Sequence, residues 1–347
     1  MTREQILDYL KTTDESHLET LWQTADGVRR QEVGDAVHLR GLLEISNHCI
    51  RQCHYCGLQA GNTAVTRYRM PVEEILACAH EGLSFGYGTV VIQAGEDPGL
   101  TRQWVADLVR RIKGETPLAV TLSLGERSEE DLAAWRQAGA DRYLLRFETS
   151  NPTLYQRIHP ALPGGAPDRI TLLRTIKALG YETGSGVMIG IPGQTWDDLA
   201  ADIEQFRALE LDMIGVGPFI PHGATLLGQP GASTIASEEQ VPNTELLTYK
   251  VMALARLVCP SANIPATTAL ATLNTPTGRE LCLSRGANIV MPNLTPKKYR
   301  ALYEIYPSKA CIDETASDCR ACMHGRIRSI GREVGRGRGD APRRQLA

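Results

Sequence analysis

Residues 39–57 read "LRGLLEISNHCIRQCHYCG", a short and largely apolar run that leads directly into three cysteines within eight positions. A run of this length is typical of a strand that is covered on both faces, as in a parallel sheet. The cysteines stand where the strand ends, and functional groups of parallel α/β folds lie at the carboxyl ends of the strands. This stretch therefore predicts an α/β fold with a chemically active loop after its first strand.

Seven similar runs follow, and helical patterns separate them from one another. The eight strand candidates are residues 39–46, 88–95, 117–124, 141–148, 182–190, 212–219, 263–270 and 286–293. The helical patterns cover residues 71–86, 101–114, 128–139, 151–160, 168–180, 195–210, 243–258 and 277–286. Several begin at an N-cap residue or stop at a glycine, namely at Thr101, Ser128, Asp168, Thr195, Gly86, Gly114, Gly139, Gly180 and Gly286. Eight strand–helix units predict a (βα)8 TIM barrel, with an open doubly wound sheet as the alternative.

The barrel prediction divides the chain into a helical extension (1–38), the barrel (39–293) and a cysteine-containing C-terminal extension (294–347). Residues 1–21 have the pattern of an amphipathic helix and carry too much charge for a signal peptide. No apolar run reaches the roughly 18 residues of a transmembrane helix, so no membrane association is expected. The Arg- and Gly-rich tail, 325–347, is expected to be solvated and partly disordered.

The charge balance and the cysteines limit the class of function. The 347 residues carry a formal net charge of −3, which gives no general attraction to nucleic acid or to an anionic membrane. Six of the nine cysteines fall in two clusters. The total of nine is odd, and this together with the clustering favours metal binding in a reducing compartment over a disulfide framework, so a cytoplasmic protein is expected.

The first cluster has the spacing Cys49–x3–Cys53–x2–Cys56, which is one ligand short of a structural zinc site. His48 or His54 could supply a fourth ligand to zinc. Alternatively, the three thiolates hold a 4Fe–4S cluster and leave one iron open. An open iron can bind the amino and carboxylate groups of S-adenosylmethionine, and electron transfer then yields a 5′-deoxyadenosyl radical.

The CxxxCxxC pattern, with an aromatic residue before its last cysteine, resembles the radical S-adenosylmethionine superfamily. In the resemblance, Gly95 and Glu96 belong to the element that receives the cofactor's ammonium group. Glu148 would accept from the ribose hydroxyls, and Arg169 would pair with the methionyl carboxylate. From the residues alone, a polar turn and a helix-start charge are the ordinary alternatives. The cofactor contacts that the resemblance implies are Tyr55, Gly95, Glu96, Asp97, Glu148, Arg169, Gly186 and Ile220.

Longer stretches resemble the HydE family, the radical maturases of FeFe-hydrogenase, among them "LGYETGSGVMIGIPGQT" (179–195), "IGVGPFIPH" (214–222) and "YRALYEIYP" (299–307). The resemblance implies a closed cavity inside the barrel and an organometallic substrate, a cysteine-ligated iron that carries CO and cyanide. It also implies partners, namely the maturases HydG and HydF and an electron donor such as ferredoxin or flavodoxin. The residues that match the family's substrate side are Gln93, Thr121, Ser123, Arg146, Thr268, Met291, Tyr303 and Tyr306.

Two positions depart from the family's usual pattern. Ala94 stands where the family usually has serine, and Phe147 stands where it usually has histidine. If both side chains line the cavity, its polarity and its substrate differ from the family's. An amino-acid mutase that resembles methylornithine synthase is therefore an alternative, as is a scaffold that carries clusters without catalysis. An enzyme like biotin synthase is disfavoured, because the second, third and fifth strand candidates carry no cysteine.

The second cluster comprises Cys311, Cys319 and Cys322. In the family this region can hold an auxiliary iron–sulfur cluster, so a 2Fe–2S cluster is expected here. Three cysteines again leave one ligand short, Asp318 and His324 are nearby donors, and zinc is the alternative. The remaining cysteines fall inside helical patterns and are expected to be buried core residues: Cys78, Cys259 and Cys282.

Overall fold

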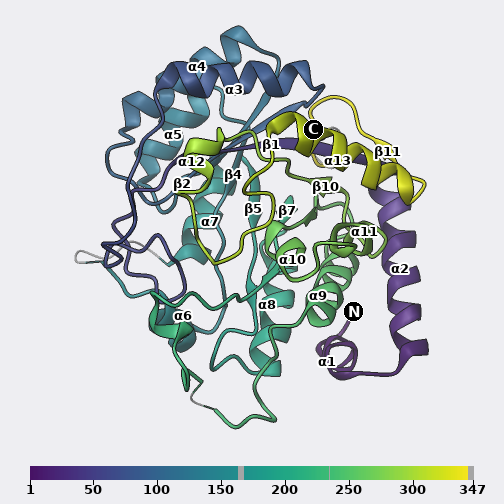
Figure 1. Ribbon diagram of the computed structural model, residues 1–347. Helices are drawn as coiled ribbons and strands as arrows, with labels where there is room; N and C mark the ends of the chain where they lie inside the picture. Colours follow the sequence, from purple (N-terminus) through teal and green to yellow (C-terminus); the bar gives the residue numbers. More distant parts are fainter. Residues whose placement is uncertain (163–167, 234, 343–347) are drawn as a thin grey trace.

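The computed structural model describes residues 1–162, 168–233 and 235–342, and Figure 1 shows a parallel sheet surrounded by helices. The strands lie in the order β7-β5-β4-β3-β2-β1-β10-β9, and a parallel bridge from Met213 to Asn263 brings the two ends of this order together. The predicted (βα)8 barrel is confirmed, and the open doubly wound sheet is excluded. The barrel strands are β1 (Ala36–Ser46), β2 (Thr89–Ala94), β3 (Ala119–Ser123), β4 (Arg142–Leu144), β5 (Glu182–Ser185), β7 (Met213–Ile214), β9 (Pro265–Ala266) and β10 (Ile289–Val290).

Helices fill the connections between the strands. The barrel helices are α3 (Val72–Ser84), α4 (Arg102–Glu115), α5 (Glu129–Gln137), α6 (Pro152–Ile158), α7 (Arg169–Ala178), α8 (Trp196–Ala208), α9 (Glu245–Val258), α10 (Thr268–Leu273) and α11 (Gly278–Leu283). Four predicted N-caps are confirmed, since each side chain accepts a hydrogen bond from a backbone N–H of the first turn: Thr101, Ser128, Asp168 and Thr195.

Several boundaries differ from the predictions, and most of the barrel strands after β3 are shorter than predicted. Gly114 does not end its helix, because α4 continues to Glu115. The predicted strand 263–270 is also too long, because α10 begins at Thr268. Two further strands, β6 (Met188–Ile189) and β8 (Gly217–Pro218), follow β5 and β7 and pair with each other outside the barrel sheet.

The N-terminal extension contains two helices where the sequence predicts one. The first, α1 (Arg3–Lys11), ends before Asp14, whose side chain caps α2 (Glu15–Val33). In Figure 1 both helices lie along one side of the barrel, where α1 packs against α8 and α9 and α2 packs against α9. Their apolar faces are buried there, as the fully buried Ile6 and Leu10 show. The extension thus covers the barrel without contributing to its mouth.

The strand register places polar side chains in layers inside the barrel. Glu44 of β1 pairs with Gln93 of β2, which pairs with Ser123 of β3. Thr121 lies two residues before Ser123, and alternate residues of a strand face the same side. All four side chains line one interior cavity. Parallel register therefore gathers residues from three strands that are far apart in sequence.

The C-terminal extension begins at the cavity, which Tyr306 and Lys309 line, and ends at the N-terminal ends of the barrel strands. It contains α12 (Lys297–Arg300), α13 (Ala316–Ser329) and β11 (Glu333–Val334), which pairs with the start of β1. Figure 1 shows α13 and β11 side by side near the end of the chain.

Beyond β11 the tail crosses the N-terminal ends of the barrel strands. The backbone oxygen of Arg338 accepts hydrogen bonds from Thr89 and Arg142 at 2.8 and 3.1 Å. The backbone oxygen of Gly339 accepts from Arg40 at 2.9 Å. The expectation of a solvated tail is therefore wrong up to this point, because the tail satisfies buried polar groups under the barrel. The last tail residues, 343–347, lie outside the described part of the chain.

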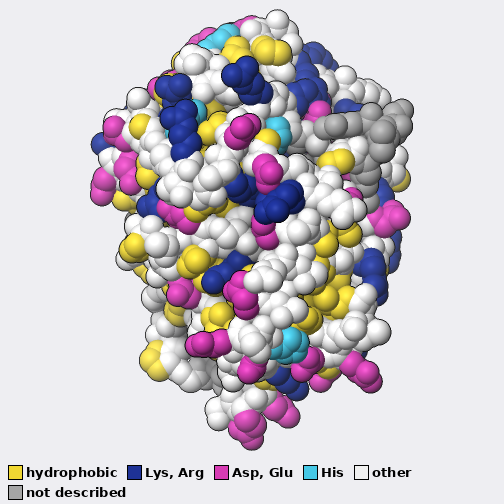
Figure 2. Space-filling view, turned by 90° about the vertical axis from the view of Figure 1, so that its right-hand side faces the viewer, with side chains coloured by type: hydrophobic (Ala, Val, Ile, Leu, Met, Phe, Trp, Pro, Cys, Tyr) yellow, Lys and Arg dark blue, Asp and Glu magenta, His cyan; other side chains and the backbone are white. Residues whose placement is uncertain are grey.

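The surface drawn in Figure 2 carries charges of both signs, and the lone cysteines are buried. None of the described helices is both long and apolar enough to cross a bilayer. On the face drawn in Figure 2, Lys and Arg side chains are interspersed with Asp and Glu. None of the nine cysteines, all of which the structure describes, forms a disulfide, and the three expected in the core are buried: Cys78, Cys259 and Cys282.

Candidate active site

The cysteine loop follows the C-terminal end of β1, at the end of the barrel opposite to the tail. The backbone N–H of His54 donates to the oxygen of Ile158 at 2.9 Å, and that of Gly57 donates to the oxygen of Ile305 at 3.0 Å. Arg67 donates to four backbone oxygens of the same loop. Hydrogen bonds from the loop's own backbone and from Arg67 therefore hold the loop in place.

The three thiols of the loop are spread more widely than the ligands of a single zinc ion. Among the described residues, Cys49, Cys53 and Cys56 do not all lie within 4.8 Å of one another. Ligands of one tetrahedral zinc ion would be about 3.8 Å apart, whereas a cluster lets each thiolate bind a different iron. Burial raises the pKa of all three thiols, that of Cys56 to about 12, so they become thiolates when metal charge compensates them.

A buried network of charges lies beside the cysteine loop. Arg51, inside the cysteine motif, donates to Glu96 at 2.7 Å and also contacts Glu126. Arg169 donates to Glu126 at 2.8 Å and to His159 at 2.7 Å. Two buried arginines thus share Glu126, which satisfies the requirement that buried charges be paired. Arg169, the predicted partner of the methionyl carboxylate, is already oriented by this network.

His159 is neutral in this network. Burial, followed by the charges of Arg169 and Arg51, lowers its pKa to about 2. Its Nε2 therefore accepts the hydrogen bond from Arg169, and the proton resides on Nδ1. Nδ1 lies 3.3 Å from the hydroxyl of Tyr155, which in turn lies 3.3 Å from Glu126. The imidazole and the phenol thus extend the arginine network toward α6.

The predicted Gly95–Glu96–Asp97 element has a structural basis of its own. Asp97 is fully buried and accepts hydrogen bonds from Ser46 at 2.7 Å, Arg69 at 2.7 Å and the N–H of Gly99 at 2.8 Å. These contacts tie the ends of β1 and β2 together. A Cβ at Gly95 would lie 2.3 Å from the backbone oxygen of His48, so only glycine permits this approach to the cysteine loop.

Glu148 combines backbone strain with an unpartnered oxygen. Its φ of +64° lies in the left-handed region, which is uncommon for a non-glycine residue. Its side chain is buried, and Oε2 has no hydrogen-bond partner although Arg146 lies 3.1 Å away. Buried polar oxygens normally have a partner, and strained residues gather at functional sites. Glu148 therefore fits the expected acceptor for ribose hydroxyls.

The other predicted cofactor contacts are Gly186, Tyr55 and Ile220, and the backbone oxygen of Gly186 accepts from the N–H of Glu148 at 3.1 Å. A Cβ at Gly186 would lie 1.7 Å from the backbone oxygen of Gly215, so the close approach of the two backbones requires the glycine. Tyr55 packs against a small apolar cluster that includes Leu154. Ile220 is half-buried just after β8. Their contacts to the cofactor stay predictions.

An interior cavity of about 200 Å³ occupies the barrel. It is lined by seven of the eight residues that match the family's substrate side: Gln93, Thr121, Ser123, Arg146, Thr268, Met291 and Tyr306. The eighth, Tyr303, is buried and its hydroxyl lies 3.4 Å from Nε2 of Gln93. The structure thus brings together residues from β2, β3, the loops after β4 and β10, α10 and the segment after α12.

The cavity carries an excess of positive charge and free donors. Arg40, Arg146 and Lys309 line it, against a single carboxylate, Glu44, which is paired with Lys309. Nε of Arg40, Nε of Arg146 and the hydroxyl of Thr121 are buried without a partner. Unpaired buried donors are costly, so the cavity suits a substrate that accepts hydrogen bonds or carries negative charge.

The two departures from the family pattern lie outside this cavity. Neither Ala94 nor Phe147 is among its lining residues. The ring of Phe147 is buried and lies 5.9 Å from that of Phe206 on α8, so it packs outward into the core. The polarity of the cavity is therefore unaffected by either residue.

Four residues of the site were missed at the sequence level: Arg51, Glu126, Tyr155 and His159. Glu126 could have been found, because it follows the end of β3 as Glu148 follows the end of β4. The carboxyl ends of barrel strands are where functional side chains gather. The other three are recognisable only through their contacts with Glu126 and Arg169.

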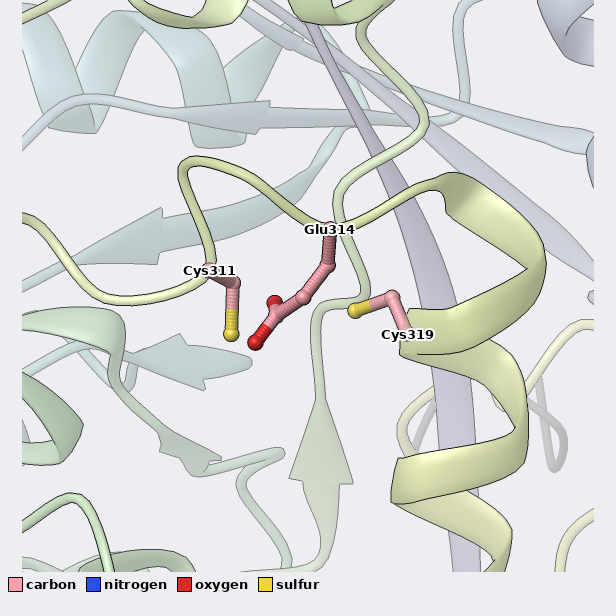
Figure 3. Close-up of side chains that lie close together, drawn as sticks. All are labelled: Cys311, Glu314 and Cys319. Carbon is pink, nitrogen blue, oxygen red and sulfur yellow. The ribbon is translucent and has the colours of Figure 1, made fainter.

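The second cysteine cluster lies on the C-terminal extension. Figure 3 shows Cys311 and Cys319 close to each other and to Glu314, while Cys322 is exposed and stands outside this group. Asp318 instead accepts hydrogen bonds from Thr315 in the capping box of α13. The expected 2Fe–2S cluster stays a prediction.

Comparison with known proteins shows the family of this chain. A sequence model of the radical SAM superfamily matches residues 43–206. Together with the barrel and the three-cysteine loop after β1, this match defines a radical S-adenosylmethionine enzyme. The [FeFe] hydrogenase maturase subunit HydE of Thermotoga maritima is 45% identical over 96% of this chain and 92% of its own length. The protein belongs to the HydE family.

More distant relatives share the same architecture. A 3-methylornithine synthase of Methanosarcina acetivorans is 28% identical over 81% of this chain and 76% of its own length. The crystal structure of a methylornithine synthase superposes with a TM-score of 0.80 at 25% identity, covering 96% of this chain and 94% of that one. The crystal structure of HydG, a maturase of the [FeFe]-hydrogenase, shares the fold at 19% identity, with a TM-score of 0.76 over 96% of this chain and 71% of that one.

Proposed function

We propose that this enzyme cleaves S-adenosylmethionine reductively and directs the radical at a cysteine-ligated iron that carries CO and cyanide, during assembly of the diiron subcluster of FeFe-hydrogenase. The observation that carries the proposal is the interior cavity. Seven residues matched to the substrate side of the HydE family line it, and they come from separate strands and loops. HydG and HydF as partners, and ferredoxin or flavodoxin as electron donor, belong to the same proposal.

The charges of the cavity support this substrate over an amino acid. Cyanide, CO and thiolate ligands present lone pairs, which suit the unpartnered donors of Arg40, Arg146 and Thr121. The ammonium group of an amino acid would instead meet three cations and a carboxylate, Glu44, that Lys309 already neutralises. Like charges in a buried cavity repel strongly.

The residues of the cofactor site have separable tasks. Cys49, Cys53 and Cys56 would hold a 4Fe–4S cluster, which when bound and reduced supplies the electron that splits S-adenosylmethionine into methionine and a 5′-deoxyadenosyl radical. The oxygen Oε2 of Glu148, which accepts no hydrogen bond within the chain, would accept from the ribose, and Arg169, oriented by Glu126, would bind the methionyl carboxylate.

Arg146 connects the cofactor site with the cavity. Its guanidinium lines the cavity and also lies 3.1 Å from the carboxylate of Glu148. The two sites therefore adjoin at this pair, which would orient the substrate next to the ribose. The interior position of the cavity keeps bulk water away from the reacting groups.

Hydrogenase maturation in vitro tests the proposed function. Apo-hydrogenase, HydF, HydG and an extract that lacks HydE would be supplemented with this protein, and hydrogen evolution would be measured. We expect activity to depend on this protein and on S-adenosylmethionine. An inactive hydrogenase, together with formation of methylornithine from its isomer lysine, would instead identify a mutase.

The two charged cofactor contacts predict graded losses of affinity. A hydrogen bond to a charged group contributes roughly 1.5–3 kcal/mol, which is about tenfold to a hundredfold or more in Kd. Glu148→Gln keeps a carbonyl acceptor and should fall at the low end. Arg169→Met removes every donor and should lose more. Calorimetric titration of S-adenosylmethionine into anaerobically reconstituted variants measures both effects.

Arg174→Met is the matched control, because Arg174 is an exposed arginine on the same helix, α7. It should bind S-adenosylmethionine like the wild type, and all three variants should retain four irons in the cluster. If Arg169→Met also bound with wild-type affinity, another cation would hold the carboxylate.

A further inference from the structure

Asp202 on α8 is a fully buried carboxylate that lies outside the reaction cavity. Four hydrogen bonds reach it, and all of them come from uncharged donors. Burial raises the pKa of its carboxyl to about 7, and the hydrogen bonds from Ser150 oppose this rise. Because a carboxylate is costly to bury, the groups that Asp202 holds indicate what it does.

The oxygen Oδ1 of Asp202 holds the two residues that follow Glu148. It accepts hydrogen bonds from the backbone N–H of Ser150, from the Ser150 hydroxyl at 2.7 Å and from the Thr149 hydroxyl at 3.3 Å. Glu148 itself has the left-handed φ of +64°. Such a conformation persists only where the surrounding structure fixes it, and Asp202 fixes the chain on the C-terminal side of Glu148.

The oxygen Oδ2 of Asp202 continues the contact back to Glu148 by a second route. It accepts from Nε2 of Gln194 at 3.2 Å, and the same Nε2 donates to the backbone oxygen of Met188 at 3.3 Å. The N–H of Met188 in turn donates to the backbone oxygen of Glu148 at 3.2 Å. Oε1 of Gln194 accepts from the N–H of Gly190 at 2.8 Å, which fixes the orientation of its amide. A closed ring of hydrogen bonds therefore surrounds Glu148, with Asp202 opposite to it.

We propose that Asp202 is a positioning residue for S-adenosylmethionine, whose carboxylate holds Glu148 in the conformation that presents Oε2 to the ribose hydroxyls. Asp202 acts through Ser150 and Gln194, which occupy its own two oxygens. A hydrogen bond weakens steeply as its angle departs from linearity, so the orientation of Glu148 matters as much as its charge. The inference rests on the proposed role of Glu148 in cofactor binding.

Asp202→Asn tests the inference without a change of shape. The new amide can still accept from Ser150, but its NH2 group then faces Nε2 of Gln194, and two donors cannot bond to each other. We expect the Kd of S-adenosylmethionine, titrated calorimetrically into anaerobically reconstituted protein, to rise about tenfold, as happens when metal sites lose an outer-shell partner. Hydrogen exchange of the peptide that contains Ser150, measured without cofactor, should become faster. Iron content should stay at the wild-type value, because the ring contains no cysteine.

A second substitution should restore binding. Gln194→Glu alone places another carboxylate against Asp202 and should also weaken binding. In the double variant Asp202→Asn/Gln194→Glu, the new amide donates to the new carboxylate, so the ring closes with the opposite polarity. The double variant should recover most of the lost affinity, since contacting residues show coupled effects. A residue with a merely structural role would not show this recovery.

Asp212→Asn is the matched control. Asp212 is also fully buried and accepts from a backbone N–H, that of Thr183 at 2.8 Å, but it precedes β7 at the opposite end of the barrel. This variant should bind S-adenosylmethionine like the wild type. Equal losses of affinity in Asp212→Asn and Asp202→Asn, or no recovery in the double variant, would assign Asp202 to general stability and overturn the inference.

The variant Glu148→Gln separates the inference from the proposed function. Wild-type affinity in Asp202→Asn, together with weakened binding in Glu148→Gln, would overturn the positioning role and leave the proposed function intact. Wild-type affinity in both variants would refute the cofactor contact of Glu148 and the inference with it.

Discussion

Cys53→Ala is expected to abolish the formation of 5′-deoxyadenosine. Two thiolates, from Cys49 and Cys56, are too few for a cluster that needs three protein ligands. The loop itself should keep its shape, because its hydrogen bonds come from backbone groups and from Arg67. The loss should therefore appear in iron content and in cofactor cleavage, while circular dichroism stays unchanged. Anaerobic reconstitution followed by chromatography of the products measures both.

Cys322→Ala is the control for this prediction. It removes an exposed thiol from α13, far from the cysteine loop in the chain, and should leave cleavage at the wild-type rate. Undiminished 5′-deoxyadenosine formation in Cys53→Ala would refute the assignment of the three-cysteine loop to the radical cluster.

Arg142→Met is expected to lower the free energy of unfolding by about 3–5 kcal/mol, the cost of breaking a buried ion pair from one side. Arg142 is fully buried at the start of β4 and donates to Glu182 at 2.5 Å, and it also contacts Asp340 of the tail. Without the guanidinium, two carboxylates face each other under the barrel. Denaturant unfolding monitored by circular dichroism measures the loss.

Arg338→Met provides the comparison, because Arg338 pairs with the same Asp340 but its side chain is 41% exposed. Ion pairs in contact with solvent contribute about 0–1 kcal/mol, so this change should be nearly neutral. Equal losses in the two variants would show that the tail, rather than the buried charge, sets the stability of this end.

The barrel and the cysteine loop could be predicted from local patterns. Runs of apolar residues mark strands covered on both faces, and N-caps such as Ser128 mark the helix starts between them. The motif of Cys49, Cys53 and Cys56 is visible in the sequence alone, because its three residues lie within one short segment. The side chains of Gln93 and Ser123 lie in the same layer of the barrel interior, because the parallel register aligns the ends of β2 and β3.

The partners in the buried ion pairs could not be predicted, because only the tertiary structure brings them together. Arg51 and Glu126 lie 75 positions apart, and Arg142 and Asp340 lie 198 positions apart. Nothing in the Arg- and Gly-rich tail distinguishes a solvated segment from one that crosses the barrel. Composition describes what a segment prefers in isolation, whereas the unsatisfied groups at the strand ends determine where it lies.

The role of Asp318 beside the second cysteine cluster can be predicted from the sequence. Asp318 is a nearby donor for a metal, but it stands three residues after Thr315 at the start of a helix. That spacing is a capping box, which occupies the carboxylate with backbone and hydroxyl donors. Glu314 lies just before the box and has no capping role, which leaves it free to face the cysteines.

The most direct test of the proposed function is the yield of 5′-deoxyadenosine from the reduced, reconstituted enzyme with different additions. We expect S-adenosylmethionine to be cleaved under reduction and a cysteine-ligated iron dicarbonyl cyanide complex to raise the yield, whereas lysine should not. No cleavage under any condition would contradict the radical assignment and favour a scaffold. Stimulation by lysine alone would contradict the organometallic substrate and favour a mutase.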